Sequence, residues 1–198
     1  RGERTQSSGA RAVKMLATGL PEVHLIEPDV FGDERGWFLE NWRAEHYAGQ
    51  GIEAGFAQVN TSHSRFGVLR GLHFQWPEPQ GKLVWVSAGR VFDVAVDIRV
   101  DSPHFGRWTA AELSAENHHQ FWIPEGFAHG FQVLSDQATF SYLCTRPYRS
   151  DYDRALAWND ETIGIDWPHP PDALSQKDAS APRLDQFDKE RLPKCESF

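Results

Sequence analysis

The chain has 198 residues, of which 40% are hydrophobic, and it carries a formal net charge of −8. This length suits a single domain with a substantial core, and we expect residues 15–198 to form it. The acidic balance and the lack of a Lys/Arg cluster exclude a typical nucleic-acid partner. No apolar run approaches the roughly 20 residues that a membrane-spanning helix needs, so no membrane partner is expected.

The N-terminal segment, residues 1–14, is polar and precedes Met15, the only methionine. We expect this segment to be a disordered leader or a segment added for expression, separate from the fold. The two cysteines, Cys144 and Cys195, lie far apart in the chain, which argues against a disulfide framework. A reducing, cytoplasmic location is therefore expected.

Short runs with strand character, separated by Gly, Pro and Asp, follow one another along most of the chain. Strands are expected at Val23–Pro28, Trp37–Trp42, Val68–Gln75, Leu83–Ser87, Val91–Ile98, Trp108–Leu113, Gln120–Ile123, Phe131–Leu134 and Thr139–Thr145. Ala44–Gln50 is expected to form a short helix, and the Pro- and Asp-rich tail after Trp158 to form loops and short helices around the strands. Many short, closely spaced strands predict an all-β sandwich or barrel.

The clearest strand is Val91–Ile98, in which four apolar residues at alternate positions share one face. Phe92 lies on its apolar face, whereas Asp93 and Asp97 lie on the other face, because successive side chains of a strand point to opposite sides.

His73 is the most suggestive of the nine histidines, because it lies in the strand-like run VLRGLHFQ with Lys82 shortly after it. Arg70 precedes His73 by three residues, so strict alternation would place the two side chains on opposite faces of a strand. A bulge at Gly71 would bring both into one cavity. An isolated strand histidine is more often structural, and only this neighbourhood favours a function.

The run PEGFAHGF, which contains His129, has the spacing P-x-G-x-x-H that resembles the second half of the cupin barrel signature. In metal-dependent cupins the first half supplies two histidines one residue apart and then a glutamate. Here His73 is the counterpart, but position 75 is Gln75, so the sequence offers at most two of the three or four ligands that a metal site needs. We therefore expect a barrel without a metal. A plain turn at Pro124 and Gly126 is compatible with the same residues.

Two further residues have both a structural and a functional interpretation. Tyr142 is either a half-buried core residue or a phenolic acid that donates a proton. Asp178 is first a helix cap or turn residue, and it becomes functional only if the tail folds back onto His73.

Taken together, the chain resembles the family of dTDP-4-dehydrorhamnose 3,5-epimerase and its relatives in deoxysugar biosynthesis. The resemblance covers about residues 20–185, and its motifs occur in the family's order. They are FGDERGWFLE (31–40), GVLRGLHFQ (67–75), QGKLV (80–84), GRVFDVAVDIR (89–99), LSAEN (113–117), FWIPEGFAHGF (121–131), WNDETIGIDWP (158–168) and LSQKDASAPRL (175–184). The resemblance implies a cupin-type jelly-roll β-barrel with short helices and a C-terminal tail packed around it. It also implies a cofactor-independent epimerase of a dTDP-4-keto-6-deoxyhexose that acts as a homodimer.

The resemblance also implies a role for individual residues. His73 matches the proton-abstracting base, Asp178 matches the carboxylate that orients it, and Tyr142 matches the proton donor on the other face of the sugar. Lys82 matches the cation near the ketone oxygen, and Tyr148 an aromatic residue that stacks on thymine. The remaining substrate-contacting positions match Arg35, Glu40, Gln58, Asn60, Arg70, His129, Asp153 and Lys177.

Several positions depart from the family pattern. The stretch often written QDNHS reads QVNTS here, with Val59 and Thr61 at the changed positions. Tyr148 is preceded by Pro147 instead of a second aromatic residue, and Asp153 stands where glutamate is common. These changes leave open an epimerase of one carbon only, at C3 or at C5. A metal-dependent cupin enzyme and a non-catalytic sugar-binding cupin are the alternatives of other classes.

Overall fold

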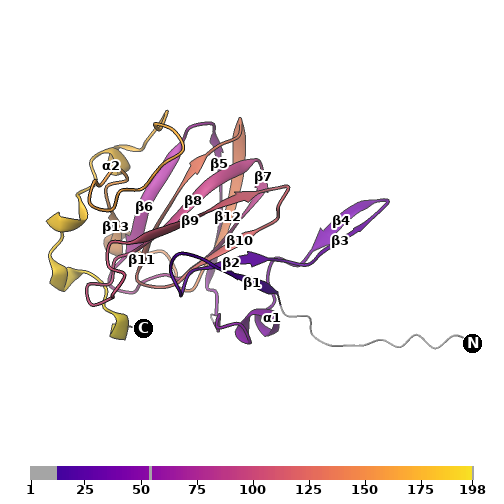
Figure 1. Ribbon diagram of the computed structural model, residues 1–198, viewed down its shortest axis with the longest axis horizontal. Coiled ribbons are helices and arrows are strands. Elements are labelled where there is room, and N and C mark those ends of the chain that lie inside the picture. Colours follow the sequence, from indigo (N-terminus) through magenta and orange to yellow (C-terminus); the bar gives the residue numbers. More distant parts are fainter. Residues whose placement is uncertain (1–12, 54, 198) are drawn as a thin grey trace, which may run out of the picture.

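The computed structural model describes residues 13–53 and 55–197 and consists mainly of antiparallel strands (Figure 1). The strands are β1 (Lys14–Ala17), β2 (His24–Glu27), β3 (Val30–Asp33), β4 (Gly36–Leu39), β5 (Gln58–Arg65), β6 (Leu69–Gln75), β7 (Lys82–Ala88), β8 (Arg90–Asp97), β9 (Trp108–Ser114), β10 (Gln120–Ile123), β11 (Phe127–Val133), β12 (Gln137–Cys144) and β13 (Asp153–Ala155). The α-helices are α1 (Ala44–Ala48) and α2 (Gln176–Ala179), and short 3-10 turns are η1 (Ser150–Tyr152), η2 (Leu184–Gln186), η3 (Lys189–Arg191) and η4 (Cys195–Ser197).

Two sheets form the body of the molecule. One has the order β1-β2-β10-β7-β12-β5 and the other the order β13-β6-β11-β8-β9, while β3 and β4 form a separate hairpin. All strand pairs within them are antiparallel, and neighbours in space are often distant in the chain, as in a jelly roll. The all-β jelly-roll architecture predicted from the sequence is therefore confirmed. Among the described residues, no helix is long and apolar enough to cross a membrane.

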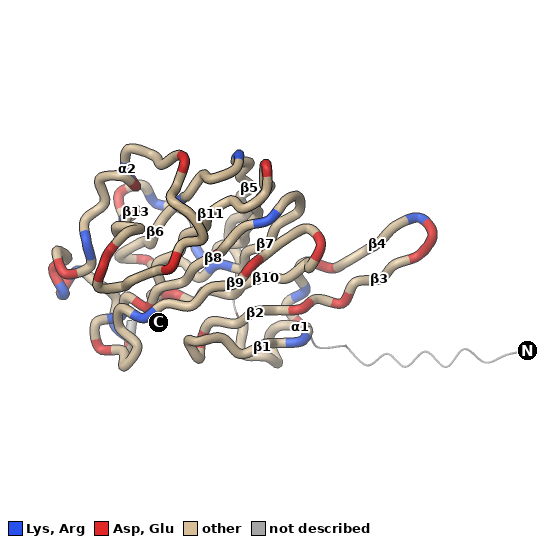
Figure 2. Tube along the Cα trace, turned by 45° about the horizontal axis from the view of Figure 1, so that its top comes forward, with Lys and Arg blue, Asp and Glu red and all other residues tan. Residues whose placement is uncertain are grey.

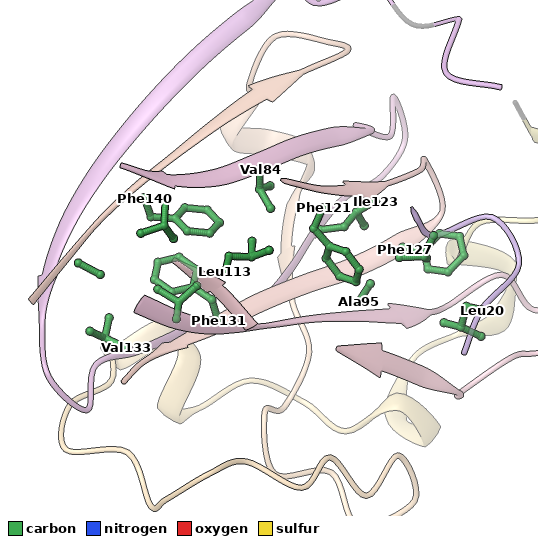
Figure 3. Close-up of a cluster of buried hydrophobic side chains, with 14 residues drawn as sticks. Leu20, Val84, Ala95, Leu113, Phe121, Ile123, Phe127, Phe131, Val133 and Phe140 are labelled. Atoms are coloured by element: carbon green, nitrogen blue, oxygen red, sulfur yellow. The ribbon is translucent and has the colours of Figure 1, made fainter. Parts of the chain in front are cut away.

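The main core lies between the two sheets (Figure 3). Val84, Phe121 and Phe140 come from the six-stranded sheet, and Leu113 and Phe131 from the five-stranded sheet. The rings of Phe131 and Phe140 stack with their centroids 4.1 Å apart, so the sheets are in direct contact there. Burying a side chain of this size stabilises the fold by roughly 1.5–3 kcal/mol, which fixes the spacing of the strands that bear the polar residues described below.

The outer face of the five-stranded sheet and part of the outer face of the six-stranded sheet are covered as well. The tail after β13 packs Leu156 and Ile163 against Val94 and Val96 of β8, and Figure 1 shows this tail, with α2, along one side of the barrel. Helix α1 packs Tyr47 against Ile26, Leu83 and Trp122, which covers the part of the six-stranded sheet formed by β2, β7 and β10. The expected tail of loops and short helices is confirmed. Strand β8 therefore has its apolar face under the tail, and its other face points toward the inside of the barrel.

The structure differs from the predicted elements mainly where strands are short or polar. Strands β1, β3, β5 and β13 were not predicted. Strands β1, β3 and β13 have only three or four residues, and β5 reads QVNTSHSR, with little apolar alternation. Strand β11 begins four residues earlier than expected, and β4 ends three residues earlier. Strand β1 begins at Lys14, just before the expected start of the domain. The rest of the expected leader, residues 1–12, lies outside the described residues.

A candidate active site between the two sheets

A polar cavity of about 340 Å³ opens between the two sheets. It is continuous with a second space of about 220 Å³, because His73, Lys82 and Tyr142 line both. The other lining residues predicted from the sequence are Gln58, Asn60, Arg70, His129, Tyr148, Asp153 and Lys177. A larger hollow of about 650 Å³ lies elsewhere, beside Trp122, and none of the predicted site residues lines it.

His73 reaches this cavity because β6 contains a bulge. His129 of β11 pairs with His73, but Phe131 pairs with Arg70, so β6 has one more residue than β11 over this stretch. Gly71 lies at the extra position with a φ of 131°, and a Cβ there would come within 2.6 Å of a backbone atom of β11. The bulge predicted at Gly71 is confirmed, and both Arg70 and His73 line one space.

The tail folds back so that Asp178 lies behind His73. The His73 Nε2 lies 2.6 Å from Asp178 Oδ1, and the carboxylate is 3% exposed. Burial acts to raise the pKa of Asp178, but the hydrogen bond and charge of His73 and the backbone N–H of Gly71 outweigh it and hold the pKa below its usual value. An ionised carboxylate that accepts the Nε2–H leaves Nδ1 of His73 with its lone pair.

Ser175 fixes the position of Asp178 in the tail. Its hydroxyl accepts a hydrogen bond from the Asp178 backbone N–H at the start of α2, as expected of an N-cap. Asp178 is therefore both a residue of a capped helical turn and the partner of His73. The cap of α2 is Ser175, so Asp178 is not itself the helix cap that the sequence suggested, and its contact with His73 meets the condition set for the functional interpretation.

Tyr142 and Lys82 face His73 from the opposite sheet. Tyr142 lies on β12 and Lys82 at the start of β7, where it pairs in register with Cys144. Burial raises the pKa of Tyr142, so the phenol keeps its proton at neutral pH. Burial lowers the pKa of Lys82, although the nearby Cys144, Asp153 and Asp93 oppose this shift. The cavity thus has an imidazole on one wall and a phenol and an amine on the other.

Asp93 and His129 form a second carboxylate–imidazole pair, which is buried. The His129 Nε2 lies 3.0 Å and 3.1 Å from the two Asp93 oxygens, and Asp93 is fully buried. Burial raises the pKa of Asp93 and lowers the pKa of His129, with each partner opposing the shift of the other. The sequence analysis placed Asp93 on the polar face of this strand but did not assign it to the site.

At the mouth of the cavity, polar residues form a connected set around an exposed ring. The Tyr148 hydroxyl donates to Asp153 Oδ2 at 3.1 Å, and Lys177 pairs with the same carboxylate. Gln58 accepts the Tyr148 backbone N–H at 2.8 Å and donates to Asn60. The structure therefore brings together five of the predicted substrate-contacting residues within one group.

Two predicted substrate-contacting residues, Arg35 and Glu40, are not among the residues that line this cavity. Arg35 lies at the tip of the β3–β4 hairpin, where it pairs with Asp33. Glu40 pairs with Arg43 and His46 near α1. Figure 2 shows that the charged tip of this hairpin projects away from the two sheets.

The positions that depart from the family pattern in β5 face away from the cavity. Gln58, Asn60 and Ser62 line it, so the alternating residues point to the opposite side of the strand. Val59 is 61% exposed, and the Thr61 hydroxyl bonds to Ser141. Neither Val59 nor Thr61 is among the residues that line this cavity.

Within the described part of the chain, no group of three or more His, Cys, Asp and Glu residues lies together as a metal site would require. His73 and His129 are instead each paired with a carboxylate.

The comparisons with known proteins agree with this geometry. A family model described as dTDP-4-dehydrorhamnose 3,5-epimerase matches residues 17–186. The dTDP-4-dehydrorhamnose 3,5-epimerase of Salmonella typhimurium is 52% identical over 175 residues, which are 87% of this chain and 96% of that protein. The crystal structure of a dTDP-6-deoxy-D-glucose-3,5-epimerase from Legionella pneumophila, in complex with dTDP-4-keto-L-rhamnose, superimposes with a TM-score of 0.90 at 49% identity, covering 92% of this chain and 98% of that one.

A relative with a different specificity is less similar. A 3′-monoepimerase from Streptomyces bikiniensis, in complex with dTDP-quinovose, superimposes with a TM-score of 0.83 at 32% identity, covering 90% of this chain and 92% of that chain. The two 3,5-epimerases described above are thus more similar in sequence than this monoepimerase, while the fold is shared. The chain belongs to the dTDP-4-dehydrorhamnose 3,5-epimerase family of isomerases.

Proposed function

We propose that this protein converts dTDP-4-dehydro-6-deoxyglucose to dTDP-4-dehydrorhamnose by inverting C3 and C5, with His73 as the base. The observation that carries the proposal is that His73 and Tyr142 face each other from opposite sheets across one cavity. Inversion of a carbon requires a proton to leave one face of the sugar and another to arrive on the opposite face. A base and an acid on facing walls meet that requirement.

The reaction needs a base because the C4 ketone makes the C3 and C5 protons acidic. Nδ1 of His73 takes the proton from C3 or C5. The C–H electron pair then forms a double bond to C4, the π electrons of the ketone move to its oxygen, and an enolate results. Asp178, bonded to Nε2, holds the ring in the reactive tautomer and stabilises the imidazolium that results. This chemistry moves only protons, so no redox step is required.

Lys82 stabilises the enolate oxygen. It extends from β7 into the same cavity as His73 and Tyr142, where it is half-buried and partly shielded from water. A well-placed donor at a developing oxyanion contributes about 3–4 kcal/mol to transition-state stabilisation. Tyr142 then delivers its proton to the carbanion from the face opposite His73, and its raised pKa keeps that proton available.

The nucleotide supplies binding energy that fixes the sugar against His73. Arg70 lines the inner space and holds phosphate oxygens, a task for which the planar guanidinium is suited. Tyr148, 52% exposed at the mouth, offers its ring to the thymine base. Gln58, Asn60, His129, Asp153 and Lys177 complete the contacts with the sugar nucleotide.

We further infer that the active protein is a homodimer in which the β3–β4 hairpin of one copy reaches the site of the other. The hairpin and its flanks expose Val30, Phe31, Trp37 and Phe38 at 41–66%, a cluster that an isolated chain would leave in water. The same hairpin carries Arg35, which is remote from the cavity of its own chain. A second copy would cover the aromatic cluster and receive Arg35 and Glu40, and a twofold axis makes the exchange reciprocal.

The free thiols support a reducing compartment. Cys144 is buried and Cys195 is exposed, and neither is in a disulfide. We propose that the protein acts in the cytoplasm, where such thiols persist.

The experiment is to incubate the purified protein with dTDP-4-dehydro-6-deoxyglucose and to determine the configuration of the product by NMR. Inversion at both carbons is expected, in line with the outward orientation of Val59 and Thr61. Inversion at one carbon would make the protein a single-position epimerase. A folded protein that leaves the substrate unchanged would contradict the proposal.

A further inference from the structure

The segment that bears Tyr148 is held in place by glutamine side chains. One backbone group of each of four consecutive residues between β12 and η1 bonds to a glutamine amide. The Arg146 carbonyl accepts from Gln80 at 2.7 Å, and the Pro147 carbonyl accepts from Gln75 at 3.4 Å. The Tyr148 N–H donates to Gln58 at 2.8 Å, and the Arg149 N–H donates to Gln75 at 2.7 Å.

The three glutamines come from separate elements that surround the mouth of the cavity. Gln58 is the first residue of β5, Gln75 is the last residue of β6, and Gln80 lies two residues before β7. The Tyr148 segment therefore takes its position from three strand ends. The hydroxyl of Tyr148, at the other end of the side chain, is held by Asp153.

Gln75 makes the largest number of these contacts. Its Nε2 also donates to the Glu78 carbonyl at 2.6 Å, and the residue is only 4% exposed. A buried amide whose oxygen and nitrogen are both engaged fixes the backbone on either side of Tyr148. This is the position at which a metal-dependent cupin would have a ligand, so the structure shows what the glutamine does there instead.

We propose that Gln75 is a positioning residue for base recognition. It holds the Tyr148 ring in the position and orientation in which a pyrimidine base stacks on it. This inference rests on the proposed function, because it assigns the thymine of a dTDP-sugar to Tyr148. Gln75 lines the cavity, but both atoms of its amide are bonded to backbone groups on either side of Tyr148, so we infer that it acts through Tyr148. A ring that is held in advance loses little freedom on binding, and the stack then adds to the affinity for the nucleotide.

Loss of this positioning should affect nucleotide binding and leave the chemical step unchanged. Gln75→Met keeps the side-chain volume and removes all three hydrogen bonds of the amide, those to Glu78, Pro147 and Arg149. We expect the dissociation constant for dTDP and the KM for the dTDP-sugar to rise roughly 3- to 10-fold, the range that a single aromatic stack contributes, with kcat preserved. Gln80→Ala, at a less buried position, should give a smaller rise in the same direction. Gln137→Met, at the exposed far end of β12, is the matched control and should change neither constant.

Calorimetric titration with dTDP and with inorganic pyrophosphate separates this role from a general structural one. Pyrophosphate lacks the base, so Gln75→Met should lower the affinity for dTDP and leave the affinity for pyrophosphate unchanged. In a Tyr148→Ala background, Gln75→Met should cause no further loss of dTDP affinity. The positioning role would be overturned if Gln75→Met lowered the affinity for dTDP and for pyrophosphate equally. It would also be overturned if Gln75→Met had the same effect in the Tyr148→Ala background as in the wild-type protein. If Tyr148→Ala leaves the affinity for dTDP unchanged, the assignment of the base to Tyr148 in the proposed function is itself wrong.

Discussion

Asp178 and His73 are 105 residues apart in the chain, yet their side chains meet at 2.6 Å. The contact depends on two separate features, a bulge in β6 that turns His73 into the cavity and a capped helical turn that delivers Asp178 from the tail. The imidazole is thereby held in one tautomer, with Nδ1 free on the cavity side. A base of this kind is the central element of the proposed reaction.

Replacing Asp178 by Asn should leave the fold and the nucleotide affinity nearly intact and lower kcat roughly 10³- to 10⁴-fold. The amide cannot stabilise the imidazolium and favours the wrong tautomer, as when the carboxylate of a hydrolase triad is replaced by an amide. Measuring kcat together with dTDP affinity checks this. A variant with near-normal kcat would remove Asp178 from the orienting role.

Replacing Tyr142 by Phe should slow epimerisation strongly and still permit the C3 and C5 protons to exchange with solvent. His73 can form the enolate without Tyr142, but the proton can then return only from the face it left. NMR of the recovered sugar in heavy water distinguishes exchange from inversion. If solvent exchange and inversion slowed by the same factor, Tyr142 would not be a separate acid.

The activity should fall as the pH rises through the pKa of Lys82, because only the ammonium stabilises the enolate. Burial lowers that pKa, whereas Cys144, Asp153 and Asp93 raise it and Lys177 lowers it further. The decline should therefore begin below the ordinary lysine range, and Asp93→Asn should move it to lower pH by removing a negative charge. The pH profile of kcat/KM measures both effects, and a decline that moved to higher pH in this variant would contradict the assignment. Tyr142 is excluded as the source, because its pKa is raised.

The proposed exchange of hairpins predicts complementation between inactive variants. Arg35→Ala and His73→Ala should each be inactive or nearly so, but subunits mixed by co-refolding should regain about one quarter of wild-type activity, since half of the dimers are mixed and each contains one intact site. The control pair is Lys82→Ala with His73→Ala, whose mutations fall in the same site and should not complement. Absence of recovery in the first mixture would place Arg35 outside the partner's site.

Much of the fold could be predicted from the sequence because apolar alternation is strong in the strands that form the core. Val91–Ile98 was identified from its pattern, and in the structure Phe92, Val94, Val96 and Ile98 pack under the tail. The polar strand β5 was missed, since Gln58 and Asn60 face a cavity and not an apolar core. Short edge strands such as β13 also lacked a signal, because three residues do not establish a period.

The candidate site was predicted in part from single residues and in part from family resemblance. Gly71 alone indicated the bulge that joins Arg70 and His73 in one cavity. The contact of Asp178 with His73 could not be predicted from spacing, because it depends on where a long tail packs. The pairing of Asp93 with His129, and the glutamines around Tyr148, likewise depend on strand order, which no local pattern specifies.

The most direct test is site-resolved deuterium incorporation with the wild-type protein and with His73→Asn. Each is incubated in heavy water with dTDP-4-dehydro-6-deoxyglucose, and C3 and C5 are followed by NMR. We predict deuterium at both carbons with the wild-type protein and at neither with the variant, while the variant still binds dTDP. Incorporation by His73→Asn at a rate close to wild type, or its absence from both carbons with the folded wild-type protein, would contradict the role of His73 as the base.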